Sequence, residues 1–173
     1  MAVSNTFETL IPRSYLRTGR NHLGKAIFAR HSISEGELIC RFGGTLFHIK
    51  ELPARRRNTH DYFLQVGDFV FLGKSKNLDD YMNHSCDPSC GLLYLPDGIY
   101  LKALRDISHG EEITYDYSTT MWQTGESMRC KCRSSKCREV VQDFDQLPEE
   151  IKVDYLGKGI VLPFIRTNHA YAT

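Results

Sequence analysis

Three cysteines stand close together in the C-terminal third of this 173-residue chain, and thiols at such spacing can bind a metal ion. Cys130, Cys132 and Cys137 share one short stretch whose other residues are charged or polar. Such a stretch has no apolar core of its own, whereas thiolates about 2.3 Å from Zn²⁺ fold small polar loops. The spacing favours a structural zinc site over unrelated free thiols. A fourth ligand must come from elsewhere, and Cys86 and Cys90 are the candidates.

Two further segments carry polar and aromatic side chains that are able to do chemistry: NHSCDPS at residues 83–89 and GEEITYDY at residues 110–117. Taken singly, each has an ordinary explanation, because Asn-His and Asp-Pro form turns and Tyr-Asp-Tyr can end a half-buried strand. In this order, and followed by the three cysteines, they resemble the SET domain of S-adenosylmethionine-dependent protein lysine methyltransferases with its zinc-binding post-SET segment. The resemblance covers about residues 15–140.

The resemblance implies a site for S-adenosylmethionine. The Asn-His pair is expected to contact the adenosine end of the cofactor, largely through backbone groups. A short loop at residues 24–26 stands where the family has its Gly-x-Gly cofactor loop. The cofactor-binding residues implied in this way are Gly24, Lys25, Ala26, Tyr81, Asn83, His84 and Tyr117.

Two tyrosines of the second segment are implied to be catalytic. Tyr117 matches the catalytic tyrosine of the family, and Tyr115 matches the position where Phe or Tyr tunes the number of methyl groups added. Methyl transfer needs a neutral amine, whereas lysine in water has a pKa of about 10.4, so an apolar channel must favour loss of the proton. A phenol with a pKa of about 10 is a poor general base, so we expect Tyr117 to orient the nitrogen. A phenol at position 115 can hold a water molecule in the space that further methyl groups would need, so the resemblance predicts monomethylation.

The resemblance also chooses between the two candidates for the fourth zinc ligand. Cys86 matches the family's fourth ligand and would join Cys130, Cys132 and Cys137, holding the tail over the active site. A closed site made only of cysteines is structural and does not itself catalyse. The two remaining cysteines are then expected to be ordinary buried thiols.

Four positions depart from the family pattern. Ala26 replaces the second glycine of the cofactor loop, and its methyl group can narrow the approach of a ligand to the backbone. Asp80 stands where many members have Arg, Ser89 replaces an Asn, and Arg138 replaces a Gly beyond the last cysteine. These departures keep a second hypothesis open, in which the same fold and cofactor serve a non-protein acceptor or another reaction. A third hypothesis is a zinc-stabilised binding module without turnover, against which the retained Tyr117 and Asn83 argue.

The elements that must position these residues are predicted to be mainly short strands. The resemblance implies a β-clip of such strands, with a C-terminal pseudoknot that threads the Tyr-Asp-Tyr strand beside the Asn-His segment. Apolar or alternating runs broken by glycine-containing turns support strands and two hairpins. The predicted strands lie at residues 26–29, 38–42, 45–49, 62–66, 69–72, 92–95 and 99–104.

Two local patterns add detail to this fold. A short C-terminal helix is predicted from Pro148 to Gly157, because proline and acids occupy its first turn and glycine its end. The sequence ISEGELI at residues 33–39 recurs as ISHGEEI at residues 107–113, which places a glycine of each copy in a left-handed turn. The expected divisions are an N-terminal segment at 1–14, a SET domain at 15–119, a post-SET segment at 120–140 and a helical extension at 141–173, with an insert around 51–61.

Composition excludes some partners. The chain has 22 Lys+Arg against 21 Asp+Glu, so we expect no direct nucleic-acid binding, and the run Arg55-Arg56-Arg57 is predicted to be a solvated face. No apolar run approaches the roughly 20 residues of a membrane helix, and the first twenty residues contain none of secretory length. We therefore expect an intracellular protein, cytoplasmic or nuclear. Its expected partner is a lysine of a protein or peptide, with histones among the candidates.

Overall fold

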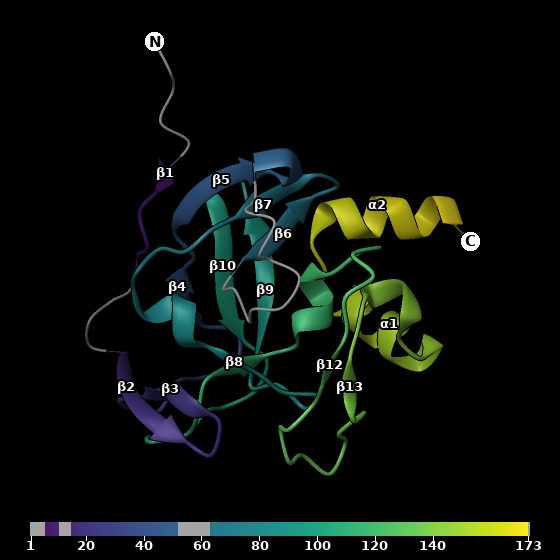
Figure 1. Cartoon of the computed structure of the whole chain (residues 1–173). Helices are drawn as coiled ribbons and strands as arrows, with labels where there is room; N and C mark the ends of the chain where they lie inside the picture. Colours follow the sequence, from purple (N-terminus) through teal and green to yellow (C-terminus); the bar gives the residue numbers. More distant parts are fainter. Residues whose placement is uncertain (1–5, 11–14, 52–62, 173) are drawn as a thin grey trace.

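The computed structural model of this chain describes residues 6–10, 15–51 and 63–172. Short strands gathered in small sheets are the main regular structure of the described backbone, and two α-helices follow near the C-terminus, as Figure 1 shows. The prediction of a mainly β protein is confirmed. The strands are β1 (Thr6–Phe7), β2 (Leu16–Asn21), β3 (Gly24–Ala29), β4 (Leu38–Arg41), β5 (Gly44–His48), β6 (Leu64–Gly67), β7 (Val70–Leu72), β8 (Asn83–His84), β9 (Cys90–Leu95), β10 (Gly98–Ala103), β11 (Thr114–Tyr115), β12 (Met128–Arg129) and β13 (Val140–Val141).

The larger sheets are built around the two predicted hairpins. One has the strand order β1-β5-β7-β6 and the other has the order β4-β10-β9. Strands β9 and β10 pair without interruption, from Leu95 opposite Gly98 to Cys90 opposite Ala103. Strands β6 and β7 turn at residues 68–69, one residue later than predicted, because a register shift lies between the β6 positions that pair with β7.

The two copies of the repeated sequence lie against each other. Ile33 and Ile107 exchange backbone hydrogen bonds at 2.9 and 2.8 Å. Gly36 and Gly110 have φ angles of +86° and +83°, so both glycines adopt the left-handed conformation that the sequence predicted. The repeat therefore builds two matching turns that face each other, and the second turn leads toward β11.

The segment after the second turn lies between two strands that are distant in sequence. On one side, the N–H of Ile113 donates to the carbonyl of Ile27 in β3 at 2.8 Å. On the other side, β11 pairs in parallel with β8, which places Tyr115 opposite His84. This threading is the crossing that the pseudoknot requires, and it brings the two sequence motifs side by side.

The C-terminal part adds a second, smaller core. Helix α1 (Glu149–Gly157) confirms the predicted helix and has Pro148 as its N-cap residue. Helix α2 (Pro163–Ala172) was not predicted, although Pro163 at its first position is a recognised start signal. In Figure 1 both helices lie to one side of the sheets. The side chains buried in this second core are Trp122, Phe144, Leu147, Tyr155, Ile160, Val161 and Ile165.

Some predictions fall where the structure gives no description. The insert expected around residues 51–61 lies outside the described residues apart from Glu51, which ends the short 3-10 helix η1 (Ile49–Glu51). The Arg55-Arg56-Arg57 run lies outside them entirely. In the described part of the chain, every helix is too short or too polar to cross a bilayer.

Candidate active site

Tyr117 is the first residue of the 3-10 helix η4 (Tyr117–Thr120), and only Asp116 separates it from the end of β11. Its hydroxyl donates to the backbone carbonyl of Met82 at 2.8 Å, and its backbone N–H donates to Nδ1 of His84 at 3.2 Å. The two rings of Tyr117 and His84 have centroids 5.4 Å apart. The structure therefore brings the predicted catalytic tyrosine and the Asn-His segment together.

His84 is neutral in this arrangement. Burial lowers its pKa to about 4, and the nearby Asp116 carboxylate only partly opposes this effect. Because Nδ1 accepts the N–H of Tyr117, Nε2 carries the proton, and it lies 3.2 Å from Sγ of Cys86. The 3.4 Å approach of Nδ1 to Asp116 is accordingly not an ion pair.

Tyr115 lies behind Tyr117, in the main core. Its side chain is buried, its ring centroid is 5.0 Å from that of Tyr117, and the edge of Phe42 packs against it at 5.9 Å. Burial, with smaller effects from Tyr117 and Asp79, raises the pKa of the Tyr115 phenol well above its ordinary value. The hydroxyl therefore keeps its proton at neutral pH and is available as a hydrogen-bond donor.

The predicted cofactor loop faces Asn83. The Asn83 side chain donates to the carbonyl of Lys25 at 3.4 Å, and the Lys25 ammonium lies 3.4 Å from the ring centroid of Tyr81, a cation–π contact. Gly24 has a φ of +117°, and a Cβ placed there would meet no atom within 4 Å. The loop thus presents an open face and one ammonium group beside Asn83.

Ala26 and Glu112 show how this loop is held. Ala26 is fully buried opposite Gly19 of β2, so its methyl group packs within the protein. Glu112, which sequence reasoning did not assign, accepts from the side-chain amides of Asn83 at 2.8 Å and Asn21 at 2.7 Å. The carboxylate therefore ties the β2–β3 hairpin to β8. Its position within the GEEITYDY segment is the sequence signal that could have identified it.

Two further departures from the family pattern, Asp80 and Ser89, serve local structure. Asp80 accepts the backbone N–H groups of Ser75 at 2.9 Å and Lys76 at 2.8 Å, so its carboxylate closes the loop before the 3-10 helix η3 (Leu78–Tyr81). Ser89 is buried, and its Oγ accepts the backbone N–H of Thr114 in β11 at 3.0 Å. Both side chains are satisfied within the fold.

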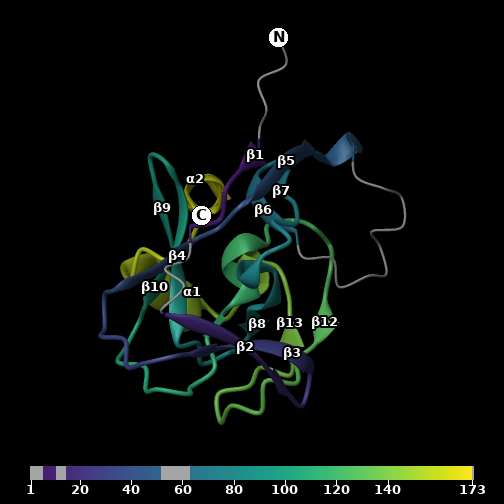
Figure 2. The same ribbon diagram turned by 90° about the vertical axis from the view of Figure 1, so that its left-hand side faces the viewer.

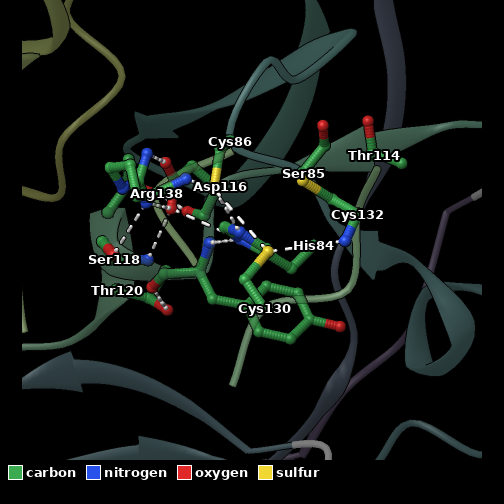
Figure 3. Close-up of polar contacts among 12 residues, drawn as sticks. His84, Ser85, Cys86, Thr114, Asp116, Ser118, Thr120, Cys130, Cys132 and Arg138 are labelled. Carbon is green, nitrogen blue, oxygen red and sulfur yellow. Dashed lines mark hydrogen bonds and ion pairs between the residues drawn. The ribbon is translucent and has the colours of Figure 1, made fainter. Parts of the chain in front are cut away.

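The four-cysteine cluster forms as predicted, with Cys86 and not Cys90 as its fourth member. The sulfur atoms of Cys86, Cys130, Cys132 and Cys137 lie within 4.8 Å of one another, and those of Cys86 and Cys130 are 3.7 Å apart. Four sulfurs about 2.3 Å from a tetrahedral Zn²⁺ are about 3.8 Å apart, so this donor set fits zinc. Figure 3 shows three of these cysteines beside His84.

The two remaining cysteines are buried thiols outside the cluster, as expected. Cys40 and Cys90 are almost fully enclosed in the main core. Burial raises the pKa of Cys90 to about 12, so its thiol is protonated at neutral pH. Position separates the two candidates, because the sulfur of Cys86 lies in the cluster and Cys90 lies in the main core.

The cysteine segment contacts the turn of the β2–β3 hairpin. His22 in the hairpin turn lies with Nε2 2.7 Å from the carbonyl of Lys131, and Figure 2 shows β12 and β13 at the same end of the molecule as β2 and β3. An open cleft of about 500 Å³ separates the two elements. Its lining residues are His22, Leu23, Arg129, Cys130, Lys131 and Arg133.

The fold and this site define the class of protein. The SET domain family matches residues 24–118, which is more than half of the chain, and the chain belongs to this family. The match contains β8, β11 and both tyrosines, whereas the cysteine segment and the C-terminal helices lie beyond it.

Curated relatives are similar over about two thirds of the chain. Histone-lysine N-methyltransferase ash1 of Drosophila melanogaster is 31% identical over 129 residues, covering 68% of this chain and 6% of that protein. Probable histone-lysine N-methyltransferase set-23 of Caenorhabditis elegans is 31% identical over 136 residues, covering 67% of this chain and 54% of that protein. The chain thus spans between about one twentieth and about half of the length of these relatives.

Solved structures share the fold. The crystal structure of KRYPTONITE in complex with mCHG DNA and SAH matches with a TM-score of 0.62 and 20% identity, covering 73% of this chain and 28% of that chain. A second KRYPTONITE structure, in complex with mCHH DNA, H3(1-15) peptide and SAH, matches with a TM-score of 0.58 and 20% identity, over 73% of this chain and 29% of that one. At this identity the likeness establishes the SET fold.

Proposed function

We propose that this chain transfers a methyl group from S-adenosylmethionine to the ε-amine of a lysine in a protein. The observation that carries the proposal is the meeting of Tyr117 with residues 82–84, where the phenol reaches the Met82 carbonyl beside the Asn-His segment. Relatives named histone-lysine N-methyltransferases support the same activity. We assign the SET domain to residues 15–119, the post-SET segment to 120–140 and a helical extension to 141–173.

The cofactor site would lie around the loop before β3. The solved relatives contain SAH, which supports S-adenosylmethionine as the cofactor, and that group would supply an electrophilic methyl on its sulfonium. Two features of this chain would fit the cofactor. The open loop at Gly24 permits the cofactor to approach the backbone closely, and the Lys25 ammonium can pair with the carboxylate of the cofactor. The residues proposed to hold it are Gly24, Lys25, Ala26, Tyr81, Asn83, His84 and Tyr117.

The chain's own residues would position the amine and keep it neutral. Tyr117 packs against the buried side chains of the main core, and an amine held beside it would be desolvated, which disfavours a charged ammonium. The hydroxyl of Tyr117 and the carbonyl of Met82, 2.8 Å apart, provide a polar edge that can orient the nitrogen lone pair. Most of the acceleration would then come from orientation and proximity and not from a general base.

The product is proposed to be mainly monomethyl-lysine. Tyr115 keeps its phenolic proton in a buried position next to Tyr117, so it can anchor a water molecule. That water would occupy the volume that a dimethyl- or trimethylammonium group requires. This preference for one methyl group depends on the Tyr115 hydroxyl.

The four cysteines would hold a structural zinc ion. Cys86 lies between β8 and β9 while the other three ligands follow η4, so one ion would join the post-SET segment to the SET domain. Zinc would supply folding energy there and would take no part in the reaction. Backbone N–H groups of Arg138 and Glu139 point at sulfurs of the cluster at 3.4 Å and help to offset its negative charge.

The proposed acceptor is a lysine in a protein, and histone tails are the first candidates. The names of the relatives and the H3(1-15) peptide in a solved relative support this choice, and a histone acceptor would place the protein in the nucleus. Other protein lysines would suit a cytoplasmic protein equally well. The DNA named with KRYPTONITE belongs to that protein, and the near-zero net charge of this chain still predicts no direct nucleic-acid binding.

The test is incubation with radiolabelled S-adenosylmethionine and three groups of acceptors: histones and histone peptides, cell lysate, and small amines. Label on protein that is absent with Tyr117→Phe would support the proposal. Label on small amines alone would establish the non-protein acceptor instead. If calorimetry detects no binding of S-adenosylmethionine, the chain is a zinc-stabilised binding module without turnover.

A further inference from the structure

Asp116, the residue between the two tyrosines, holds a buried carboxylate that the proposed reaction does not use. It is 1% exposed, and a carboxylate at such a position is costly unless it is paired and hydrogen-bonded. Its Oδ1 accepts the backbone N–H of Ser118 at 3.0 Å, which caps η4. Its other strong partners come from beyond residues 24–118, which are the part of the chain that the family covers.

Arg138 brings the cysteine segment to this carboxylate. One guanidinium nitrogen lies 2.6 Å from Oδ2 of Asp116, and the other donates to Oδ1 at 3.0 Å, as Figure 3 shows. A two-pronged contact of this kind fixes orientation as well as distance. The backbone N–H of the same arginine donates to Sγ of Cys86 at 3.4 Å. Arg138 therefore contacts both the cysteine cluster, through Cys86, and the segment between β11 and η4, through Asp116.

Tyr155 brings helix α1 to the same carboxylate. Its hydroxyl donates to Oδ2 of Asp116 at 2.9 Å, and its ring is 5% exposed within the second core cluster. The oxygen Oδ2 thus accepts from Tyr155 and pairs with Arg138, while Oδ1 accepts from Ser118 and Arg138. The carboxylate is held from three segments of the chain.

We propose that Arg138 and Tyr155 are positioning residues for Tyr117, through which the cysteine segment and the C-terminal helix set the orientation of its phenol. The inference rests on the proposed function. Asp116 and Tyr117 share one planar peptide unit, so a displaced carboxylate turns the neighbouring residue through a few soft dihedral angles. A displacement of about 1 Å at reacting groups can lower a rate about a hundredfold, so a small shift of Asp116 is expected to lower the rate of methyl transfer.

The kinetic test compares Tyr155→Phe and Arg138→Lys with Tyr171→Phe, a control on α2 whose side chain is 87% exposed. Tyr155→Phe removes the hydroxyl that donates to Asp116. Arg138→Lys keeps the positive charge but loses the simultaneous contact with both carboxylate oxygens. We expect kcat to fall roughly fivefold to tenfold in each, with the Kd of S-adenosylmethionine within about twofold of wild type. Because both residues act on one carboxylate, the double variant should lose less than the product of the single losses.

A second measurement does not depend on methyl transfer. Hydrogen exchange of the zinc-loaded full chain, without substrate, should be faster at residues 114–121 in Tyr155→Phe and Arg138→Lys than in wild type or Tyr171→Phe. Wild-type exchange there, or a lowered Tm with kcat unchanged well below the melting range, would assign these residues a merely structural role and overturn the inference. If wild type methylates nothing, the proposed function fails, and the exchange result still decides the positioning.

Discussion

The imidazole of His84 connects Tyr117 with the cysteine cluster through its two ring nitrogens. The Tyr117 backbone N–H donates to Nδ1 at 3.2 Å. Since Nδ1 accepts, the proton on Nε2 faces Sγ of Cys86 at 3.2 Å. The histidine of one motif therefore orients the backbone of the other. This contact and the Arg138–Asp116 pair are two separate connections between the cysteines and the proposed active site.

Tyr117→Phe is expected to lower kcat about a hundredfold or more, because it removes the one hydroxyl that faces the Met82 carbonyl at the proposed site. The affinity for S-adenosylmethionine should stay within about twofold, since the ring remains. Single-turnover rates measured beside calorimetric titration separate the two quantities. A near-normal rate would remove Tyr117 from the mechanism.

Tyr115→Phe is expected to raise the methylation degree from mainly monomethyl to dimethyl and trimethyl product. The substitution removes a buried hydroxyl and with it the proposed anchor for a water molecule, while the ring keeps its contacts with Phe42 and Tyr117. Mass spectrometry of a methylated peptide over time measures the distribution. Predominantly trimethylated peptide from the unaltered protein would contradict this assignment.

Lys25→Met is expected to weaken S-adenosylmethionine binding about tenfold by removing an ammonium that can pair with the cofactor carboxylate. Decarboxylated S-adenosylmethionine provides the internal check, because its affinity should change little in the same variant. Arg20→Met is the matched control, since Arg20 is the exposed β2 partner of Lys25. Equal weakening for both ligands would show that Lys25 acts only through its packing on Tyr81.

Cys137→Ser is expected to abolish stoichiometric zinc, lower the Tm and reduce methyl transfer, because a closed tetrahedral site needs all four thiolates. Wild type should contain about one zinc per chain by elemental analysis. Cys90→Ala, which alters a buried thiol outside the cluster, should retain that zinc. Loss of zinc from Cys90→Ala with retention in Cys137→Ser would reverse the ligand assignment.

Asp79 is expected to make the fold less stable as pH rises from the acid range. Burial raises the pKa of this carboxyl above its usual value although Gly43 and Ser75 donate to it. A carboxyl whose pKa is raised by folding binds its proton more tightly in the folded state. Its contribution to stability is therefore complete below the unfolded pKa of about 3.9 and is lost as the pH rises through the folded-state pKa. In urea unfolding, the wild-type free energy relative to Asp79→Asn should fall across that window. A rise would indicate a depressed pKa.

Local patterns were sufficient for much of the fold. Alternating apolar runs predicted the β9–β10 hairpin, and proline with acids predicted α1, because both signals depend on neighbouring residues. The left-handed turns at Gly36 and Gly110 follow from the same kind of information. Helix α2 was missed although Pro163 begins it, since its packing partners lie in distant segments.

The sequence by itself determined which chemical groups are present: three cysteines at metal-binding spacing, an Asn-His motif and a Tyr-Asp-Tyr strand. Spacing alone left Cys86 and Cys90 as candidates for the fourth ligand, and the family resemblance favoured Cys86. The tertiary structure then shows how the chain brings the Cys86 sulfur to the other three and leaves that of Cys90 in the core. The partners of Asp116 were likewise invisible in sequence, because Arg138 and Tyr155 reach it only after the chain has crossed itself. Contacts between distant segments depend on the whole packing arrangement and not on local residue preferences.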